Sequence, residues 1–326
     1  MKALVYEGVE TLGYRDVPQA QPRPGDHLIK VMASGICGSD MHAYLGHDER
    51  RPAPLILGHE AAGVIQGGPR DGTRVTINPL VNCGTCAACR AGRENLCPDR
   101  QIISMPPREG AFAQYVTMPE ANLVEVPDEV ALSKAALCEP LAVSWHAVRL
   151  TLEALHPSMD RSALVIGGGA IGLAAALALR AFGLEDVTIV EPNELRRDFL
   201  RDVCGQKVIA AVQGTFPAVL DAVGYAATRE IASAAVMPGG VIAHVGLGDG
   251  AGGLDIRRMT LQEVTFIGTY TYTDQDFRDT AAAIFEARLG PLDWIEQRGL
   301  SQGASAFRDI RAGRVSAPKI VLSPWE

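Results

Sequence analysis

The chain has 326 residues, of which 47% are hydrophobic and 21% are charged, and its formal net charge is −8. Such a composition is that of a globular protein long enough for two domains. The acidic balance argues against nucleic acid as a partner. The longest apolar stretch, residues 170–184, contains Arg180 and is too short to cross a membrane.

Short β-rich runs separated by Gly and Pro turns fill roughly the first 140 residues. After the first strand-like run, KALVYEG, these runs are HLIKVM, AAGVIQ, TRVTINP and FAQYVTM. Their length and spacing are typical of a small barrel or sandwich.

Two segments of this β-rich part offer metal ligands. GICGSDMHAY contains Cys37, and LGHEAAG contains His59 and Glu60. Zinc accepts a thiolate, an imidazole and a carboxylate, and three such ligands leave a fourth position for water or substrate. Taken singly, Cys37 is equally typical of a buried thiol and His59 of a core histidine. Together they predict a catalytic zinc site.

A second candidate metal site lies in the stretch CGTCAACRAGRENLC, which has the spacing C-x2-C-x2-C-x7-C. Four thiolates saturate a tetrahedral zinc ion, so this site is predicted to be structural. Its ligands are Cys83, Cys86, Cys89 and Cys97. Disulfides in a secreted chain are the alternative, but no signal peptide precedes KALVYEG, and we expect a reducing, cytoplasmic compartment.

After about residue 140, apolar strands alternate with helical segments, which predicts a parallel sheet covered on both faces, the doubly wound α/β arrangement. The strands are SALVIGGG, DVTIVEP, AVLDAVG, GVIAHVG and EVTFIGT. We place this domain at residues 143–284. The tail, residues 285–326, ends in KIVLSP and is expected to return to the domain formed by residues 1–142.

A glycine-rich turn joins the first of these strands to a helix. It consists of Gly167, Gly168, Gly169, Ala170, Ile171 and Gly172 and fits G-x-G-x-x-G. In this context the turn predicts a dinucleotide site, because backbone N–H groups and the helix N-terminus can approach a pyrophosphate. Glu191 ends the next strand, where a carboxylate accepts from the adenosine 2′-hydroxyl and repels a 2′-phosphate, so NAD is favoured over NADP.

Two features complicate this cofactor site. Arg196 and Arg197 belong either to a solvated helix face or beside the adenosine ribose, where they would weaken the discrimination between cofactors. Only six residues, VQGTFP, separate VIAA from AVLDAVG, too few for a crossover helix. Either a helix is missing beside the adenine pocket or VIAA is not the third strand. A second shortening, at QGGPRDGTRV, is expected to affect only the surface.

The order of three motifs along nearly the whole chain resembles the zinc-dependent medium-chain alcohol dehydrogenases. These motifs are GHE followed by small residues, the C-x-[ST]-D-x-H stretch, and a four-cysteine lobe before a nucleotide-binding half. The resemblance implies a GroES-like catalytic domain, a Rossmann domain, two zinc ions and hydride transfer between NAD and a secondary alcohol or polyol. Alternatives are a threonine or sugar-alcohol-phosphate dehydrogenase of the same fold, or a non-catalytic nucleotide-binding relative.

The same resemblance assigns roles to catalytic residues. Ser39 would be the first proton acceptor, His42 would pass the proton to solvent, and Asp40 would orient His59. The segment LCEPLAVSWHAV resembles the polyol branch, which places a glutamate, here Glu139, where other members have a cysteine ligand. Glu139 would either ligate the catalytic zinc or hold its water, and Cys138 beside it would not be the ligand.

Further residues follow from the resemblance with less support. The backbone of Val245-Gly246-Leu247 would lie along the nicotinamide, and Lys319 would reach the pyrophosphate. In GTYTYTD, Tyr272 matches a tyrosine of polyol dehydrogenases, but Thr271 stands where they have arginine, which disfavours a charged or long polyol substrate. The run EVTFIGTYTY would be an exposed edge strand in a monomer, so a homodimer or homotetramer is expected.

Overall fold

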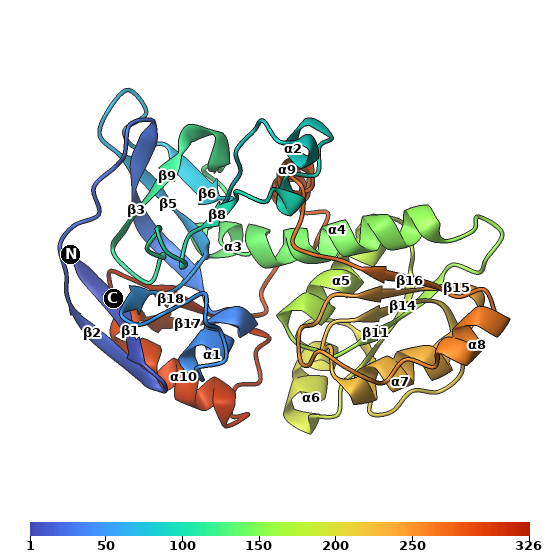
Figure 1. Cartoon of the computed structure of the whole chain (residues 1–326). Helices are drawn as coiled ribbons and strands as arrows, with labels where there is room; N and C mark the ends of the chain where they lie inside the picture. The colour runs from blue at the N-terminus through green and yellow to red at the C-terminus, as the bar shows by residue number, and fades with distance from the viewer.

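The computed structural model describes residues 1–326 and shows two lobes joined by one long helix, α4 (Cys138–Ala154) (Figure 1). One lobe is rich in strands and contains both chain termini, and the other is built on a parallel sheet. None of the helices combines the length and the hydropathy needed to span a membrane.

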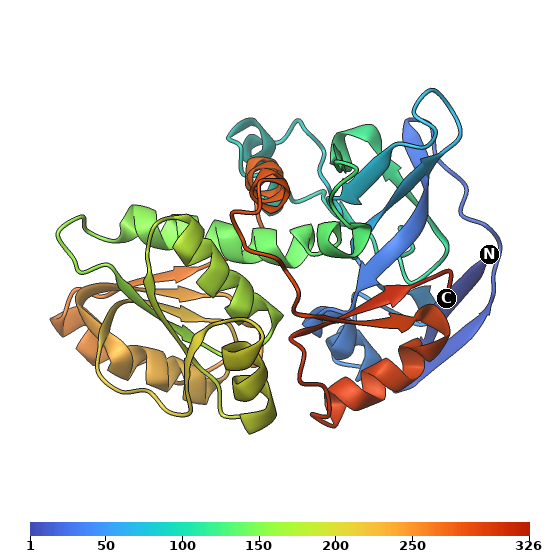
Figure 2. The ribbon, with the colours of Figure 1, turned by 180° about the vertical axis from the view of Figure 1, so that it is seen from behind.

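The β-rich lobe is built on a seven-stranded sheet. Its order is β10 (Leu123–Glu125), β6 (Arg74–Ile77), β5 (Glu60–Gln66), β3 (Asp26–Gly35), β18 (Lys319–Ser323) and β17 (Ile295–Gly299), with β9 (Tyr115–Pro119) also paired to β3. The C-terminal tail therefore does return to the first part of the chain, because β18 pairs antiparallel with β3 (Figure 2). The predicted β-rich half is confirmed.

Smaller elements complete this lobe. A three-stranded sheet has the order β2 (Thr11–Asp16), β1 (Lys2–Gly8) and β4 (Leu55–Ile56), and β7 (Leu80–Val81) pairs with β8 (Gln101–Ile102). The helices are α1 (Gly38–Tyr44), α2 (Ala87–Arg90), α3 (Leu132–Ala135) and α10 (Gly303–Arg311), with 3-10 turns at Glu94–Leu96, Glu120–Asn122 and Leu300–Gln302.

The second lobe contains a six-stranded sheet whose neighbouring strands all run parallel. Its order is β13 (Lys207–Ile209), β12 (Asp186–Val190), β11 (Ser162–Ile166), β14 (Phe216–Asp221), β15 (Val236–His244) and β16 (Thr265–Gly268). Its helices are α5 (Ala170–Ala181), α6 (Glu194–Asp202), α7 (Ala226–Ala235), α8 (Ile256–Leu261) and α9 (Asp274–Phe285). The predicted doubly wound domain is confirmed.

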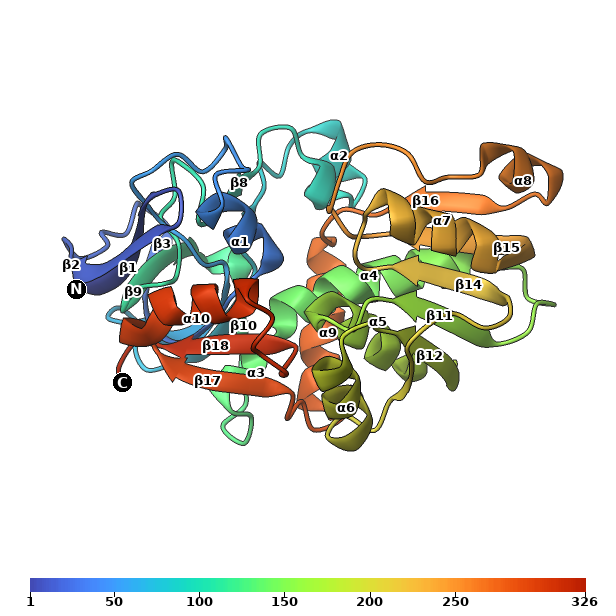
Figure 3. The ribbon, with the colours of Figure 1, turned by 90° about the horizontal axis from the view of Figure 1, so that it is seen from below.

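Helices cover both faces of this sheet because apolar residues on its strands point alternately to the two sides. In β11, Ala163 and Val165 pack in the core cluster that contains α4 and α5. Leu164 and Ile166 pack in a separate cluster with residues of α7. The helix α7 covers the other face of the sheet (Figure 3). Because all six strands run parallel, their carboxyl ends form one edge of the sheet. This edge faces the β-rich lobe.

The parallel sheet lacks one crossover helix, as its sequence predicts. The strand β13, formed by KVI, lies at the sheet edge as the third strand, so the alternative assignment of this segment is excluded. Residues 210–215 then run to β14 without a helix. Val212 in this connection packs against the same apolar cluster as α7. An extended segment thus supplies part of the cover that a helix would give.

Two expected boundaries differ in detail from the observed elements. The helix α4 begins at Cys138, so the predicted domain limit at residue 142 falls inside it, and the limits themselves remain predictions. The strand predicted in EVTFIGTYTY is shorter, because β16 ends at Gly268. Thr271 has a φ of 48° and Tyr272 is buried, so the chain has turned away from the sheet edge by that point.

Candidate active site and metal centres

The fully buried carboxylate of Asp40 holds two candidate ligand segments together. Its Oδ2 accepts a hydrogen bond from the backbone N–H of Cys37 at 3.0 Å, at the start of α1. Its Oδ1 accepts from Gly58 N at 3.2 Å and lies 3.5 Å from His59 Nδ1. One side chain thus fixes both the helix N-terminus that carries the thiol and the orientation of the imidazole ring.

Cys37, His59 and Glu60 come together as predicted, with their ligand atoms within 4.8 Å of one another. Glu60 is completely buried, and its Oε2 has no hydrogen-bond partner, which is costly for a carboxylate unless a cation binds it. The carboxylate fits only because Gly35 has no side chain, since a Cβ there would lie 2.1 Å from Oε2. Thiolate, imidazole and carboxylate together suit zinc.

Electrostatics within this cluster favour the charged form of His59. Burial acts to lower the pKa of His59, but the charges of Asp40 and Cys37 outweigh it and hold that pKa well above its usual value. A metal ion requires a neutral imidazole ligand, so its binding here releases protons.

Glu139, in the first turn of α4, lines the same cleft but lies outside the group of three close ligands. Its Oε1 accepts a 3.0 Å hydrogen bond from the buried hydroxyl of Tyr272. Burial raises the pKa of Glu139 to about 7, with His59 opposing and Glu60 adding to this effect. Its ligand role remains a prediction. Cys138 is buried and donates to the Phe277 carbonyl oxygen at 3.6 Å, away from the cluster.

Lys319 occupies a position different from the one expected at the pyrophosphate. Its ammonium donates to Glu60 Oε1 at 2.6 Å and to the Ile36 carbonyl oxygen at 2.9 Å, and the side chain is buried. The metal cluster therefore has a buried cation beside it that offsets part of its negative charge. Its placement is explained by β18, which begins at Lys319 and pairs with the end of β3 beside Gly35.

Arg51 was not singled out from the sequence, yet its buried guanidinium links Ser39 to the metal cluster. Its Nη1 donates to the Ser39 carbonyl oxygen at 3.2 Å and to Asp48, and its Nε donates to the Ser104 carbonyl oxygen at 3.0 Å. Ser104 is itself buried, has a φ of 69°, and places its Oγ 3.5 Å from His59 Nδ1. A non-glycine residue held in this left-handed conformation is typical of functional sites.

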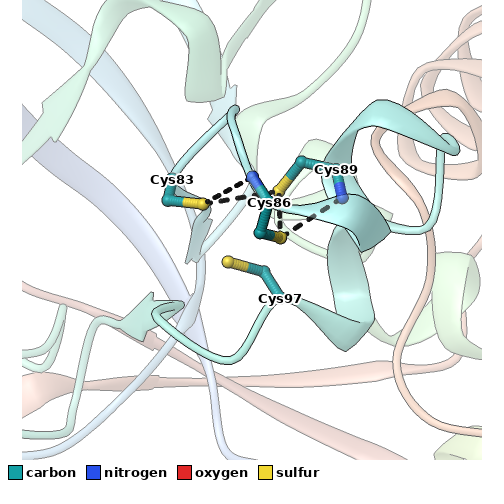
Figure 4. Close-up of side chains that lie close together, drawn as sticks. All are labelled: Cys83, Cys86, Cys89 and Cys97. Atoms are coloured by element: carbon teal, nitrogen blue, oxygen red, sulfur yellow. Dashed lines mark hydrogen bonds between the residues drawn. The ribbon is translucent and has the colours of Figure 1, made fainter.

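The four cysteines lie together in the other candidate metal centre (Figure 4). Cys89 Sγ lies 3.9 Å from Cys83 Sγ and 3.5 Å from Cys86 Sγ. Zinc–sulfur bonds of about 2.3 Å in a tetrahedron separate sulfurs by roughly 3.8 Å. The backbone N–H groups of Cys86 and Cys89 each donate to a cysteine sulfur at 3.4 Å. The donor set and its spacing fit a structural zinc ion.

Hydrogen bonding prepares one of these sulfurs to bind metal. Backbone N–H groups of Thr85 and Cys86 lower the pKa of Cys83 to about 6, whereas burial raises the pKa of Cys89 to about 12. Because metal ligation requires thiolates, this difference predicts that Cys83 is deprotonated before the metal arrives and Cys89 only when it binds.

The glycine-rich turn has the geometry that its motif predicts. Gly167 has a φ of 96°, and a Cβ on Gly172 would lie 1.8 Å from the Gly167 carbonyl oxygen, so neither position accepts a side chain. A Cβ on Gly169, which precedes α5, would meet only Arg196 Nη1 at 4.0 Å. The N-terminus of α5 is therefore open to an anion such as pyrophosphate.

Glu191 lies against this turn. Its Oε2 accepts from Gly168 N at 2.9 Å and its Oε1 from Asn193 N at 2.8 Å, which leaves lone pairs on both oxygens for ribose hydroxyls. Arg196 is half-buried beside the turn and donates to the Val315 carbonyl oxygen at 3.1 Å, so it is not a solvated residue of a helix face. Arg197 donates to the Glu191 carbonyl oxygen at 3.0 Å.

A cleft of about 340 Å³ lies between the two lobes and is lined by the predicted catalytic residues. Cys37, Ser39 and His42 line it from the β-rich lobe. Ile171 of the glycine-rich turn lines it from the other side, together with the segment that follows β15, Val245, Gly246, Leu247 and Gly248. The metal cluster and the nucleotide domain therefore open on one shared space.

Comparison with known proteins agrees with this geometry. Residues 23–128 match the alcohol dehydrogenase GroES-like domain, and residues 170–286 match the zinc-binding dehydrogenase domain. Sorbitol dehydrogenase of Arabidopsis thaliana is 30% identical to this chain, over 81% of this chain and 79% of that protein. The chain belongs to the zinc-binding alcohol dehydrogenases. It is therefore an oxidoreductase, which confirms the family inferred from the motifs.

Other members of the zinc-binding alcohol dehydrogenases resemble it over similar lengths. L-idonate 5-dehydrogenase of Vitis vinifera is 30% identical, over 81% of this chain and 78% of that protein. The structure of acetophenone reductase from Geotrichum candidum in complex with NAD is 25% identical, with a TM-score of 0.87, and the alignment covers 99% of this chain and 96% of that one.

Several cleft residues had not been identified from the sequence. Arg50, Arg51, Met105 and Tyr270 line the cleft, and Ser104 supports it. For Arg50 and Arg51, the sequence did offer a signal. They stand together before PAPLILGHE, and two charged side chains beside an apolar run require nearby partners. Ser104, in contrast, has no distinguishing sequence context.

We expect two zinc ions per chain. Cys89→Ser should reduce the count to one and lower the melting temperature, because structural zinc binding is coupled to folding. Cys37→Ser should also reduce the count to one but leave the protein folded and inactive. Metal analysis of protein purified without chelators, combined with thermal unfolding, checks both. Cys204→Ser is the control and should retain two ions, and fewer than two ions in the unaltered protein would contradict the assignment.

Arg51→Lys should lower kcat by about 10- to 100-fold, because lysine cannot bond Ser39, Ser104 and Asp48 at once. Zinc affinity at the Cys37 cluster should fall with it, since His59 loses the support of Ser104. Steady-state kinetics and competition with a chelator measure these effects. Arg23→Lys, an exposed substitution in the same lobe, is the control. A lower melting temperature with unchanged kcat and zinc affinity would show that Arg51 is only structural.

Proposed function

We propose that this enzyme transfers a hydride between NAD and a secondary alcohol or polyol. The observation that carries the proposal is the shared cleft, in which the Cys37–His59–Glu60 cluster faces the segment after β15. When bound, zinc supplies Lewis-acid polarisation of the alcohol and the nicotinamide supplies a two-electron acceptor. The likeness to sorbitol dehydrogenase favours a polyol over a simple alcohol.

The residues of the chain provide a proton path and orient the substrate. Ser39 Oγ accepts the proton of the substrate hydroxyl, and Arg51 fixes the Ser39 backbone. His42 lies on the next turn of α1 at the same cleft, half-buried, and ends the path at solvent. Glu139, held by Tyr272, orients water or the alcohol beside the cluster.

The nucleotide domain supports a preference for NAD over NADP. The Glu191 carboxylate, buried against the glycine turn, would repel a 2′-phosphate. Arg197 spends Nη1 on the Glu191 and Pro192 carbonyl oxygens, whereas Arg196 spends one N–H on the Val315 carbonyl oxygen and keeps Nη1 beside Gly169, where it would offset part of this repulsion. The backbone of Val245 lies along the cleft wall where the nicotinamide is proposed to bind.

The proposal is tested by measuring NADH absorbance when the zinc-loaded protein is given NAD and each member of a panel of secondary alcohols, polyols and amino alcohols. We expect polyols to give the highest kcat/KM and NAD to be preferred over NADP. Glu191→Ala should narrow the cofactor preference by about tenfold or more, because the repulsion of the 2′-phosphate is lost. Glu194→Ala, an exposed residue of α6, should leave it unchanged. Equal use of both cofactors by the unaltered enzyme would contradict the role of Glu191.

The assembly is proposed to be a homodimer or homotetramer. The strand β16 is at the edge of the parallel sheet, with an unpaired row of backbone groups. Exposed apolar side chains lie on and beside it, namely Ile256, Leu261 and Phe266. Pairing of β16 with its copy across a two-fold axis would cover both features. None of the seven cysteines forms a disulfide, which suits a reducing compartment, and we propose the cytoplasm.

Light scattering at micromolar concentration should give a mass of at least twice the 34.7 kDa of one chain. Phe266→Lys should shift the protein toward the single-chain mass, because a charge would then lie in the apolar contact. Val9→Lys, which alters an exposed apolar residue of the other lobe, is the matched control. A single-chain mass for the unaltered protein would reject the proposed assembly.

A further inference from the structure

Three arginines, two of them adjacent and one distant in the chain, lie at one wall of the cleft. Arg50 and Arg51 line the cleft directly, and both bond to Asp48. Arg100 lies with its guanidinium carbon 4.9 Å from the centre of the Tyr270 ring, and Tyr270 also lines the cleft. The sequence alone shows no such group, because residues 50, 100 and 270 are far apart in the chain.

This wall carries an excess of positive charge. Asp48 is hydrogen-bonded to Arg50 and Arg51, and no other carboxylate is hydrogen-bonded to any of the three guanidinium groups. The one carboxylate that lines the cleft itself, Glu139, is bonded to Tyr272. Arg100 donates only to the Cys97 carbonyl oxygen and the Tyr270 hydroxyl, and its Nε is buried without a partner. Uncompensated charge at the mouth of a cleft attracts an anion.

Arg50 is the member of this group that can bind a ligand. Its side chain is 60% exposed, whereas that of Arg51 is 2% exposed and Arg51 uses its N–H groups on Ser39, Ser104 and Asp48. Asp48 accepts from Nε of Arg50 at 2.8 Å and from Nη2 at 3.0 Å. Nη1 and the second N–H of Nη2 remain free. The bond to Asp48 raises the pKa of Arg50, with the nearby Tyr270 as a smaller cause.

The free end of Arg50 has the geometry of a carboxylate receptor. Two parallel N–H groups match the two oxygens of a carboxylate, and Asp48 holds the guanidinium plane fixed in advance. A phosphate dianion calls for more donors than this one exposed fork offers, because Arg51 and Arg100 are already enclosed. A carboxylate is therefore the anion that fits.

We propose that the natural substrate is a polyhydroxylated acid, whose secondary hydroxyl lies at the metal cluster and whose carboxylate binds Arg50. This inference rests on the proposed dehydrogenase function and narrows its substrate class. Thr271, which stands where the family resemblance predicts an arginine, also lines this cleft, and Arg50 supplies a guanidinium there from another segment.

The test compares matched pairs of hexitols and hexonates, with the same configuration at each secondary carbon, as substrates of the zinc-loaded enzyme with NAD. We expect the hexonate of the best pair to have a kcat/KM at least about tenfold above that of its hexitol. Arg50→Gln should raise KM for the hexonate by about 10- to 100-fold with kcat little changed, and leave hexitol kinetics within about twofold. Arg50→Lys keeps the positive charge but lacks the two parallel N–H groups. Its KM for the hexonate should lie between those of the unaltered enzyme and Arg50→Gln.

The matched control is Arg161→Gln, which replaces an exposed arginine of the nucleotide domain. It should leave the kinetics with both substrates unchanged. Equal kcat/KM for hexitol and hexonate, or equal losses on both in Arg50→Gln, would overturn the carboxylate assignment while the dehydrogenase function stands. Faster turnover of a hexitol phosphate than of the hexonate would overturn it in favour of phosphate. Oxidation of no alcohol in any arm would overturn the proposed function and this inference together.

Discussion

The active site depends on one buried carboxylate, Asp40. Backbone N–H groups from Cys37 and Gly58 and the ring of His59 all bond to it or lie against it, so the start of α1 and the loop before β5 cannot move independently. Although burial acts to raise the pKa of Asp40, His59 and Arg51 hold that pKa below its usual value. A charged Asp40 therefore holds the backbone of Cys37 and the ring of His59 in place beside each other.

Further charged side chains of both signs lie around Asp40 and the metal cluster. Lys319 forms a buried pair with Glu60 of the metal cluster, and Arg51 is bonded to the backbone of Ser39 and Ser104. A buried charge left without a partner is strongly destabilising, so each of these groups constrains the position of the next. Ser39, the proposed proton acceptor, is thereby held by the same network that positions the predicted metal ligands.

The sequence predicted the elements with short-range signatures. The strand alternation, the G-x-G-x-x-G turn and the cysteine spacing each follow from local geometry, and the structure has all three. Lys319 was misplaced because its partner is decided by the pairing of β18 with β3, which joins residues nearly three hundred positions apart. The arginine wall was missed for the same reason, since local sequence cannot show that residues 50, 100 and 270 converge.

The missing crossover helix shows which parts of the nucleotide domain tolerate loss. Residues 210–215 connect β13 to β14 directly, yet β13 still pairs with β12, and Ile209 still accepts from Glu191 N at 3.0 Å. The carboxyl edge of the sheet, where Glu191 and the glycine turn lie, is therefore preserved. The loss falls on the face covered by α7, where Val212 packs in place of a helix. Because cofactor and substrate both meet the protein at the strand ends, a shorter cover on one face leaves the geometry of the cleft intact.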